Sequence, residues 1–118
     1  IKAIVATNTT TDHSQLKSKH GQEWGGVSGR PLEQKATDTV ECIYGLTDLP
    51  VIGVGGVDSA ESAYKKIRHG ASLVQIYTGF VYKGPSLARQ ITTGLVELLE
   101  RDGHASIEEV VGIDCKEL

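Results

Sequence analysis

Three short apolar runs, each followed by a segment with helical spacing, limit the folds that this chain can adopt. The runs span residues 3–6, 51–54 and 73–77. Their near-continuous apolar character is typical of parallel strands that are covered on both faces. The helical patterns span residues 32–44, 58–70 and 86–102. The alternating order predicts an α/β fold with a parallel sheet and right-handed crossovers.

Local signals mark where these helices start and stop. Pro31 suits the opening turn of the first helix. Asp58 and Glu61 form a capping-box pattern at the start of the second, and Gly70 ends it. A final short helix is expected to begin at Ser106.

The spacing of the repeats favours a (β/α)8 barrel, of which three units would be present. A strand, a tight loop and a short helix fit between Val51 and Leu73, which is the size of one barrel unit. A small doubly wound domain is the alternative. The chain has 118 residues, which is one domain or part of one. Open strand edges would then make an isolated three-unit piece prone to aggregation.

Composition excludes several classes of partner. The chain has 12 basic and 15 acidic residues, so we expect no nucleic-acid partner. No apolar stretch is long enough to cross a bilayer. Cys42 and Cys115 lie far apart, and the four histidines have no metal-ligand spacing. We therefore expect neither a disulfide nor a metal site.

Polar residues follow the first apolar run, where parallel α/β folds bind their ligands. They are Thr7, Asn8, Thr9 and Thr10. Their hydroxyls and amide can both donate and accept hydrogen bonds, which suits a small polar heterocycle. Ordinary loop and cap roles are the alternative.

Glycines follow the second run and a hydroxyl follows the third. Gly55 and Gly56 allow close approach of a ligand to the backbone, and the N-terminus of the next helix favours a phosphate. Ser59 occupies the third glycine position of the dinucleotide motif, so nicotinamide binding is set aside. Tyr77 and Thr78 belong to the next loop along the sheet. The two loops predict a shared phosphate site, although a tight turn alone would also need the glycines.

A long polar segment separates the first strand from the first helix. It spans residues 11–30 and ends in a glycine-rich run that includes Ser28 and Gly29. Loops of this length in compact domains are usually lids or binding loops. We expect it to close over the ligand, with a mobile connection as the alternative. The basic cluster Lys65, Lys66 and Arg68 is interpreted as a solvated helix face.

Four motifs, in order along the chain, resemble dihydroorotate dehydrogenase. They are residues 7–10, 25–32, 52–57 and 71–78. The Gly-Arg-Pro-Leu sequence that begins at Gly29 and the segment 77–85 resemble class 2 of this family, which is quinone-dependent. Residues 1–118 would then be the C-terminal part of a single FMN-binding (β/α)8 barrel domain, with the upstream part of the barrel absent.

The resemblance implies an enzyme that oxidises dihydroorotate to orotate through FMN and passes the electrons to a membrane quinone, in de novo pyrimidine biosynthesis. The residues that it assigns to FMN are Thr7, Ser28, Gly29, Gly55, Gly56, Tyr77 and Thr78. It assigns Asn8 and Thr9 to the substrate.

The same resemblance places the catalytic base and the quinone-entry helices before Ile1. We therefore expect no catalytic residue in this chain and no activity from it alone, because a base must lie within hydrogen-bond reach of its proton. Membrane contact would come through that absent segment, at the mitochondrial inner membrane in a eukaryote or the cytoplasmic membrane in a bacterium. Two alternatives stay open: another phosphate-binding barrel enzyme without flavin, and a non-catalytic phosphate-binding module.

Overall fold

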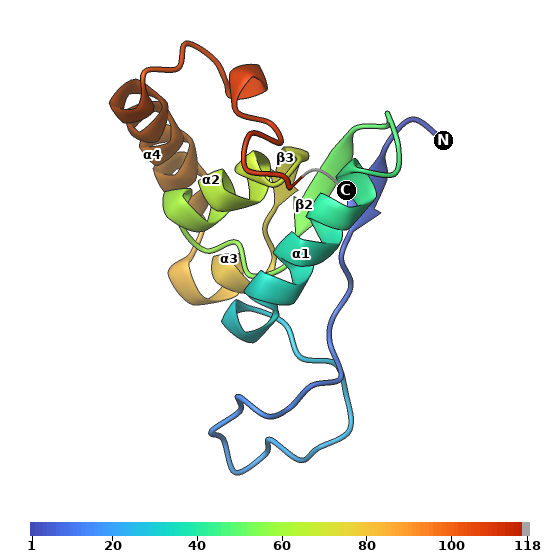
Figure 1. Ribbon diagram of the computed structural model, residues 1–118. Helices are drawn as coiled ribbons and strands as arrows, with labels where there is room; N and C mark the ends of the chain where they lie inside the picture. Colours follow the sequence, from blue (N-terminus) through green and yellow to red (C-terminus); the bar gives the residue numbers. More distant parts are fainter. Residues whose placement is uncertain (117–118) are drawn as a thin grey trace.

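Three parallel strands form the centre of the computed structural model, which describes residues 1–116 (Figure 1). They are β1 (Ile4–Ala6), β2 (Val51–Val54) and β3 (Ala71–Gln75), in the order β1-β2-β3. β1 pairs with β2, and β2 pairs with β3. The prediction of parallel β/α units is confirmed.

Four α-helices and two short 3-10 turns complete the described part of the chain. They are η1 (Arg30–Leu32), α1 (Glu33–Tyr44), α2 (Ala60–Arg68), α3 (Thr78–Lys83), α4 (Leu87–Asp102) and η2 (Ile107–Glu109). Pro31 lies in η1, immediately before α1, and the helix expected from Ser106 is the 3-10 turn η2. α3 was not predicted, because its sequence has no recurrent apolar face. No described helix is both long and apolar enough to cross a membrane.

The cap of α2 differs from the predicted Asp58–Glu61 pair. Ser59 is the N-cap, and its side chain accepts a hydrogen bond from the backbone N–H of Ser62. The Ser62 hydroxyl in turn accepts from the N–H of Ser59, which completes the capping box. The helix therefore begins one residue later than predicted, and Asp58 is free for another contact.

The helices cover one face of the sheet and form its apolar core. α1 and α2 lie against the strands, and α4 packs on α2 (Figure 1). The buried apolar side chains on these contacts include Val40, Val51, Tyr64, Ile67, Leu87, Ile91 and Leu99. Complete burial of such a side chain stabilises the fold by roughly 1.5–3 kcal/mol, so these contacts hold the strands in register.

The opposite face of the sheet is open. The side chain of Val5 on β1 is 58% exposed and that of Leu73 on β3 is 62% exposed. Ala6, the neighbour of Val5, is buried, and Val74, the neighbour of Leu73, packs partly buried against the apolar core. The alternation shows that the helices cover only one of the two faces that we expected to be covered.

The basic cluster on α2 is not a solvated face. Lys66 is fully buried, and its ammonium group donates a 2.9 Å hydrogen bond to the Thr37 hydroxyl on α1. Burial lowers the pKa of Lys66 to about 8. Lys65 pairs with Glu33 of α1. The prediction was wrong because helix periodicity places residue 66 on the same side of α2 as the apolar Ala63.

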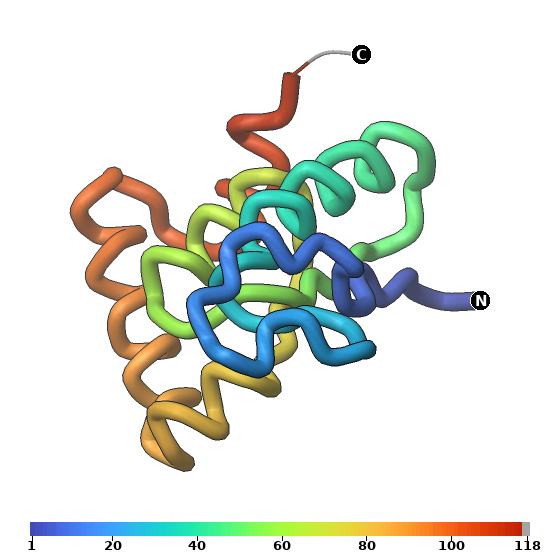
Figure 2. The backbone as a smooth tube through the Cα atoms, turned by 90° about the horizontal axis from the view of Figure 1, so that it is seen from below, coloured from blue at the N-terminus to red at the C-terminus, as the bar shows by residue number. Residues whose placement is uncertain are grey.

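The segment between β1 and η1 projects away from the sheet as a long loop (Figures 1 and 2). Its base is closed by an isolated antiparallel bridge in which Thr10 and Val27 exchange backbone hydrogen bonds of 3.0 and 2.7 Å. The loop therefore leaves and returns to the body of the molecule at one point, beside the end of β1.

Candidate functional site

A cavity of about 1060 Å³ opens at the carboxyl ends of the three strands. This position is the one that parallel α/β folds use for ligands. All nine residues predicted from the sequence line it: Thr7, Asn8, Thr9, Ser28, Gly29, Gly55, Gly56, Tyr77 and Thr78. The chain thus brings four separate sequence segments to one cavity.

The residues after β1 present directed hydrogen-bonding groups. The backbone N–H of Thr9 donates a 2.8 Å hydrogen bond to Oδ1 of Asn8. Because Oδ1 accepts this bond, the amide NH2 of exposed Asn8 is turned outward as a donor. The N–H of Thr7 donates to the carbonyl of Val54 at 2.8 Å, which ties the end of β1 to the end of β2.

Three glycines adopt backbone conformations that other residues rarely reach. The φ angles are 79° at Gly29, 119° at Gly55 and 72° at Gly56. A Cβ atom at Gly56 would overlap the backbone of Glu33, and one at Gly29 would lie 3.2 Å from the Thr78 methyl group. Backbone N–H groups at Gly29 and Gly56 donate no hydrogen bond to any described residue. They are available to an anion, as in other glycine-lined phosphate sites.

The N-terminus of α2 contributes fewer free donors than the sequence suggested. The Ser62 hydroxyl accepts hydrogen bonds from the backbone N–H groups of Asp58 and Ser59, at 3.0 and 3.1 Å. These two amides are therefore occupied within the helix cap. An anion at this edge of the sheet would therefore meet the glycine amides rather than those of Asp58 and Ser59.

Side-chain contacts tie the three loops together. The hydroxyls of Ser28 and Thr78 lie 2.8 Å apart. Arg30 donates to the carboxylate of Asp58 at 2.7 Å, and Lys83 donates to the backbone carbonyl of Asp58 at 2.7 Å. Each β/α unit therefore supplies at least one partner, so the loop positions depend on one another.

Charges at this edge favour an anion. Partial burial acts to raise the pKa of Asp58, but the Arg30 hydrogen bond and the charges of Lys83 and Arg30 outweigh it and lower that pKa. The Asp58 hydrogen bond raises the pKa of Arg30. One cation, Arg30, thus pairs with the carboxylate beside the glycine amides, and a second, Lys83, binds the backbone carbonyl of the same residue.

Sequence reasoning missed these three charged residues and the histidine of the long loop. Arg30, Asp58, Lys83 and His13 all line the cavity. A signal existed for Asp58, which directly follows the glycine-rich run after β2. None existed for Lys83, because its position depends on the unpredicted helix α3.

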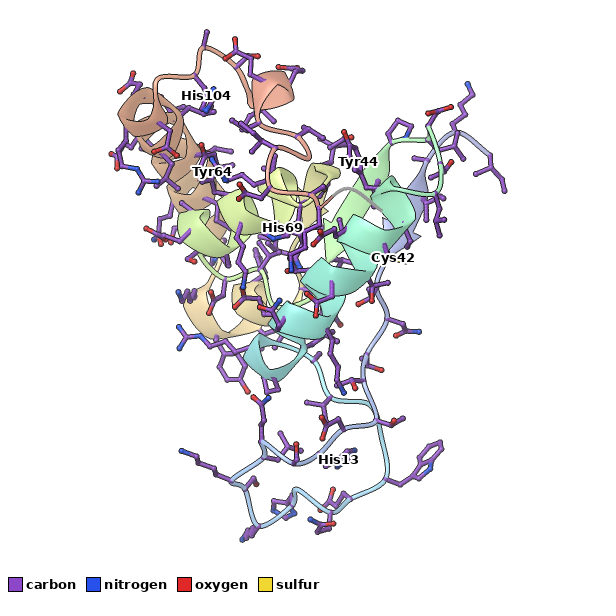
Figure 3. All side chains as sticks on the ribbon, viewed as in Figure 1. His13, Cys42, Tyr44, Tyr64, His69 and His104 are labelled. Atoms are coloured by element: carbon purple, nitrogen blue, oxygen red, sulfur yellow. The ribbon has the colours of Figure 1, made fainter. Side chains whose placement is uncertain are left out.

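No group of metal-ligating side chains forms among the described residues. Figure 3 shows His13, His69 and His104 on separate parts of the molecule. Tyr77, which directly precedes α3, is 77% exposed at the cavity and makes no side-chain cap to that helix. The site as a whole offers neutral donors, the cations Arg30 and Lys83, and the exposed aromatic rings of Trp24, Tyr77 and Tyr82.

Comparison with known proteins identifies the family. The model of the dihydroorotate dehydrogenase family matches residues 1–99. The chain belongs to the dihydroorotate dehydrogenase family. A relative in Natronomonas pharaonis, named dihydroorotate dehydrogenase (quinone), is 56% identical over 115 residues, which cover 97% of this chain and 33% of that protein. A protein of the same name in Roseiflexus sp. strain RS-1 is 54% identical, with 96% of this chain and 32% of that protein covered.

Solved structures of the family agree with the fold. Ligand-free DHODH from Eimeria tenella superposes with a TM-score of 0.92 at 36% identity, over 98% of this chain and 33% of that one. The complex of the Eimeria tenella protein with ferulenol gives a TM-score of 0.91, also at 36% identity, over 96% of this chain and 31% of that one. The chain spans about a third of the length of the family members that it matches.

Proposed function

We propose that this chain is the C-terminal part of the barrel of a quinone-dependent dihydroorotate dehydrogenase, and that its loops hold FMN and orotate. One observation carries the proposal: nine residues from four segments, chosen from the sequence, line a single cavity at the strand ends. The names of the quinone-dependent relatives support the same activity.

The glycine loops fit the phosphate of FMN. The amides of Gly29 and Gly56 are free of partners among the described residues, and the positive φ of each requires glycine. Thr78 adds a hydroxyl that Ser28 orients, and Gly55 lets the chain turn close to the ligand. Arg30 adds a positive charge at the same edge. These groups would bind and orient the phosphate.

The residues after β1 fit the heterocycles. Bound FMN would supply the hydride acceptor for oxidation of dihydroorotate. Asn8 would donate its amide N–H to a ring carbonyl or carboxylate of orotate, with Thr9 beside it. Thr7 and Tyr77 would contact the flavin from neighbouring strand ends. We assign no proton-abstracting base to this chain.

The remaining parts of the proposal rest on the family. Residues 1–118 would form part of one (β/α)8 domain, and electrons would pass from FMN to a membrane quinone. The open face of the sheet, with Val5 and Leu73 exposed, supports further barrel strands in the complete protein. The enzyme would work at the cytoplasmic membrane in a prokaryote or the mitochondrial inner membrane in a eukaryote.

Purification of the full-length gene product tests the proposal. We expect a yellow protein with FMN absorbance that converts dihydroorotate to orotate when a quinone is supplied. A protein with no flavin that binds phosphorylated sugars would support the alternative barrel enzyme. Phosphate binding with neither flavin nor turnover would support a non-catalytic module.

A further inference from the structure

His13 lies inside the long loop and contacts two backbone carbonyl groups. Its Nδ1 atom is 2.7 Å from the carbonyl oxygen of Gly21, and its Nε2 atom is 2.9 Å from that of Gly25. A carbonyl oxygen only accepts hydrogen bonds. A neutral imidazole carries one N–H and can satisfy one of these contacts, whereas the imidazolium ion donates to both.

The surroundings of His13 favour the charged form. The hydrogen bonds to Gly21 and Gly25 raise its pKa, the charge of Asp12 raises it further, and slight burial opposes them. Asp12 itself accepts a 3.1 Å hydrogen bond from Lys35 of α1. The other histidine of the loop, His20, contacts the carboxylate of Glu23.

The contact between His13 and the Gly25 carbonyl lies next to Thr9, one of the two residues proposed to bind substrate. Gly26 packs against Thr9 so closely that a Cβ atom at this position would overlap the Thr9 hydroxyl. His13 and Gly25 both line the cavity, and Figure 3 shows His13 within the long loop. A change in the position of Gly25 would therefore move the neighbour that holds Thr9 in place.

We propose that His13 is a positioning residue. Its imidazolium ion holds the long loop between β1 and η1 in one conformation through the carbonyls of Gly21 and Gly25, and the loop in turn holds Thr9 in place for the substrate. The inference rests on the proposed function, since it concerns orotate affinity. Deprotonation removes one of the two donors, so the loop loosens as pH rises through the pKa of His13. Loss of one charge-assisted hydrogen bond corresponds to about a tenfold loss of orotate affinity.

Orotate binding to the full-length flavoprotein, followed by the change in flavin absorbance between pH 6 and 9, tests this role of His13. The wild type should lose about tenfold in affinity across this range. H13R keeps a permanent cation with several N–H donors, so it should bind tightly at every pH. H13Q, which carries no charge, should bind weakly throughout. H20N alters the other histidine of the loop and should keep the wild-type profile.

Cleavage after Lys17 and Lys19 by a lysine-specific protease, which does not cut at the arginine of H13R, gives a second readout that needs no activity. Relative to its rate on an unstructured peptide at the same pH, cleavage should accelerate with pH in the wild type, stay slow in H13R and stay fast in H13Q. Equal pH profiles for wild type, H13R and H13Q in both assays would overturn this role of His13 while leaving the flavin function intact. Absence of flavin from the purified wild type would instead overturn the proposed function, and the protease assay would still report on His13.

Discussion

The ammonium group of Lys66 and the hydroxyl of Thr37 meet at 2.9 Å between α2 and α1, where both side chains are fully buried. The Thr37 hydroxyl also donates a 2.9 Å hydrogen bond to the backbone carbonyl of Glu33, which connects Lys66 to the start of α1. Glu33 in turn abuts Gly56, one of the proposed phosphate-binding residues. A buried cation thus lies behind the glycine loop and fixes the first turn of α1 against it.

Replacement of Lys66 by methionine should stabilise the protein at neutral pH. Burial lowers the pKa of Lys66 from 10.5 to about 8, so below pH 8 the folded state bears the cost of a buried charge. The unfolded state keeps its proton up to pH 10.5, so wild-type stability should rise between pH 8 and 10.5. We expect K66M to be more stable by about 1–3 kcal/mol at pH 7, with the difference closing by pH 10.5.

Urea unfolding of the full-length protein at several pH values measures this difference. K65M is the matched control, because the Lys65 ammonium pairs with Glu33 at a partly exposed position. It should change stability at pH 7 by less than about 1 kcal/mol. A K66M protein that is less stable than wild type by the same amount at every pH would contradict the expectation.

Alanine at Gly56 should damage flavin binding far more than alanine at Gly103. Both glycines have similar φ angles, 72° and 77°, so backbone strain of about 1–2 kcal/mol applies to each. Only at Gly56 does the new Cβ meet a neighbour, the backbone of Glu33. G56A should lose FMN affinity at least tenfold in a fluorescence titration, whereas G103A should match the wild type. Equal losses of FMN affinity in both variants would show that backbone strain, and not the overlap with Glu33, causes the loss.

Aspartate at position 8 should weaken orotate binding without loss of FMN. The substitution keeps the oxygen that accepts from the Thr9 N–H and replaces the outward NH2 donor by a negative charge. Orotate is an anion, so the new contact is repulsive. We expect the orotate dissociation constant of N8D to rise at least tenfold. Normal flavin content with unchanged orotate affinity would remove Asn8 from the substrate site.

Phenylalanine at position 64 should lower stability and leave the site intact. The Tyr64 hydroxyl donates to Asp102 at 2.9 Å from a buried ring, which joins α2 to α4. Hydrogen bonds from Arg101 and Tyr64 lower the pKa of Asp102 to about 2. Their stabilising effect is therefore present above pH 3.8 and is lost as pH falls toward 2. Y64F should melt at a lower temperature at pH 7, whereas Y82F, at an 84% exposed position, should not.

Strand and helix order could be predicted from the sequence because each element depends on its own periodicity. The run 51–54 coincides with β2, and the pattern at 86–102 fits α4 within one residue. The cap of α2 was misplaced because Asp58 and Ser59 are both good N-caps, and the choice depends on the ion pair between Asp58 and Arg30. No local pattern reports a contact between residues that are far apart in sequence.

The residues that follow the three strands could be placed at one cavity from the sequence because strand ends converge in any parallel sheet. Ser28 and Gly29 follow no strand, and the family resemblance indicated them instead. Charged neighbours of the site could not be inferred in this way. Lys66 was expected to face solvent because lysine is usually exposed, but the structure shows that it is fully buried. His13 lies in a loop without periodicity, where only the folded backbone brings the carbonyls of Gly21 and Gly25 to its ring.

The 2.7 Å pair between Arg30 and Asp58 joins two loops that are far apart in sequence. A carboxylate beside a bound phosphate is unfavourable unless a cation accompanies it. During evolution, an acidic residue at position 58 should therefore arise only where position 30 is already basic. Among family members, the two positions should change together, and lineages with a neutral residue at position 58 should tolerate greater variety at position 30.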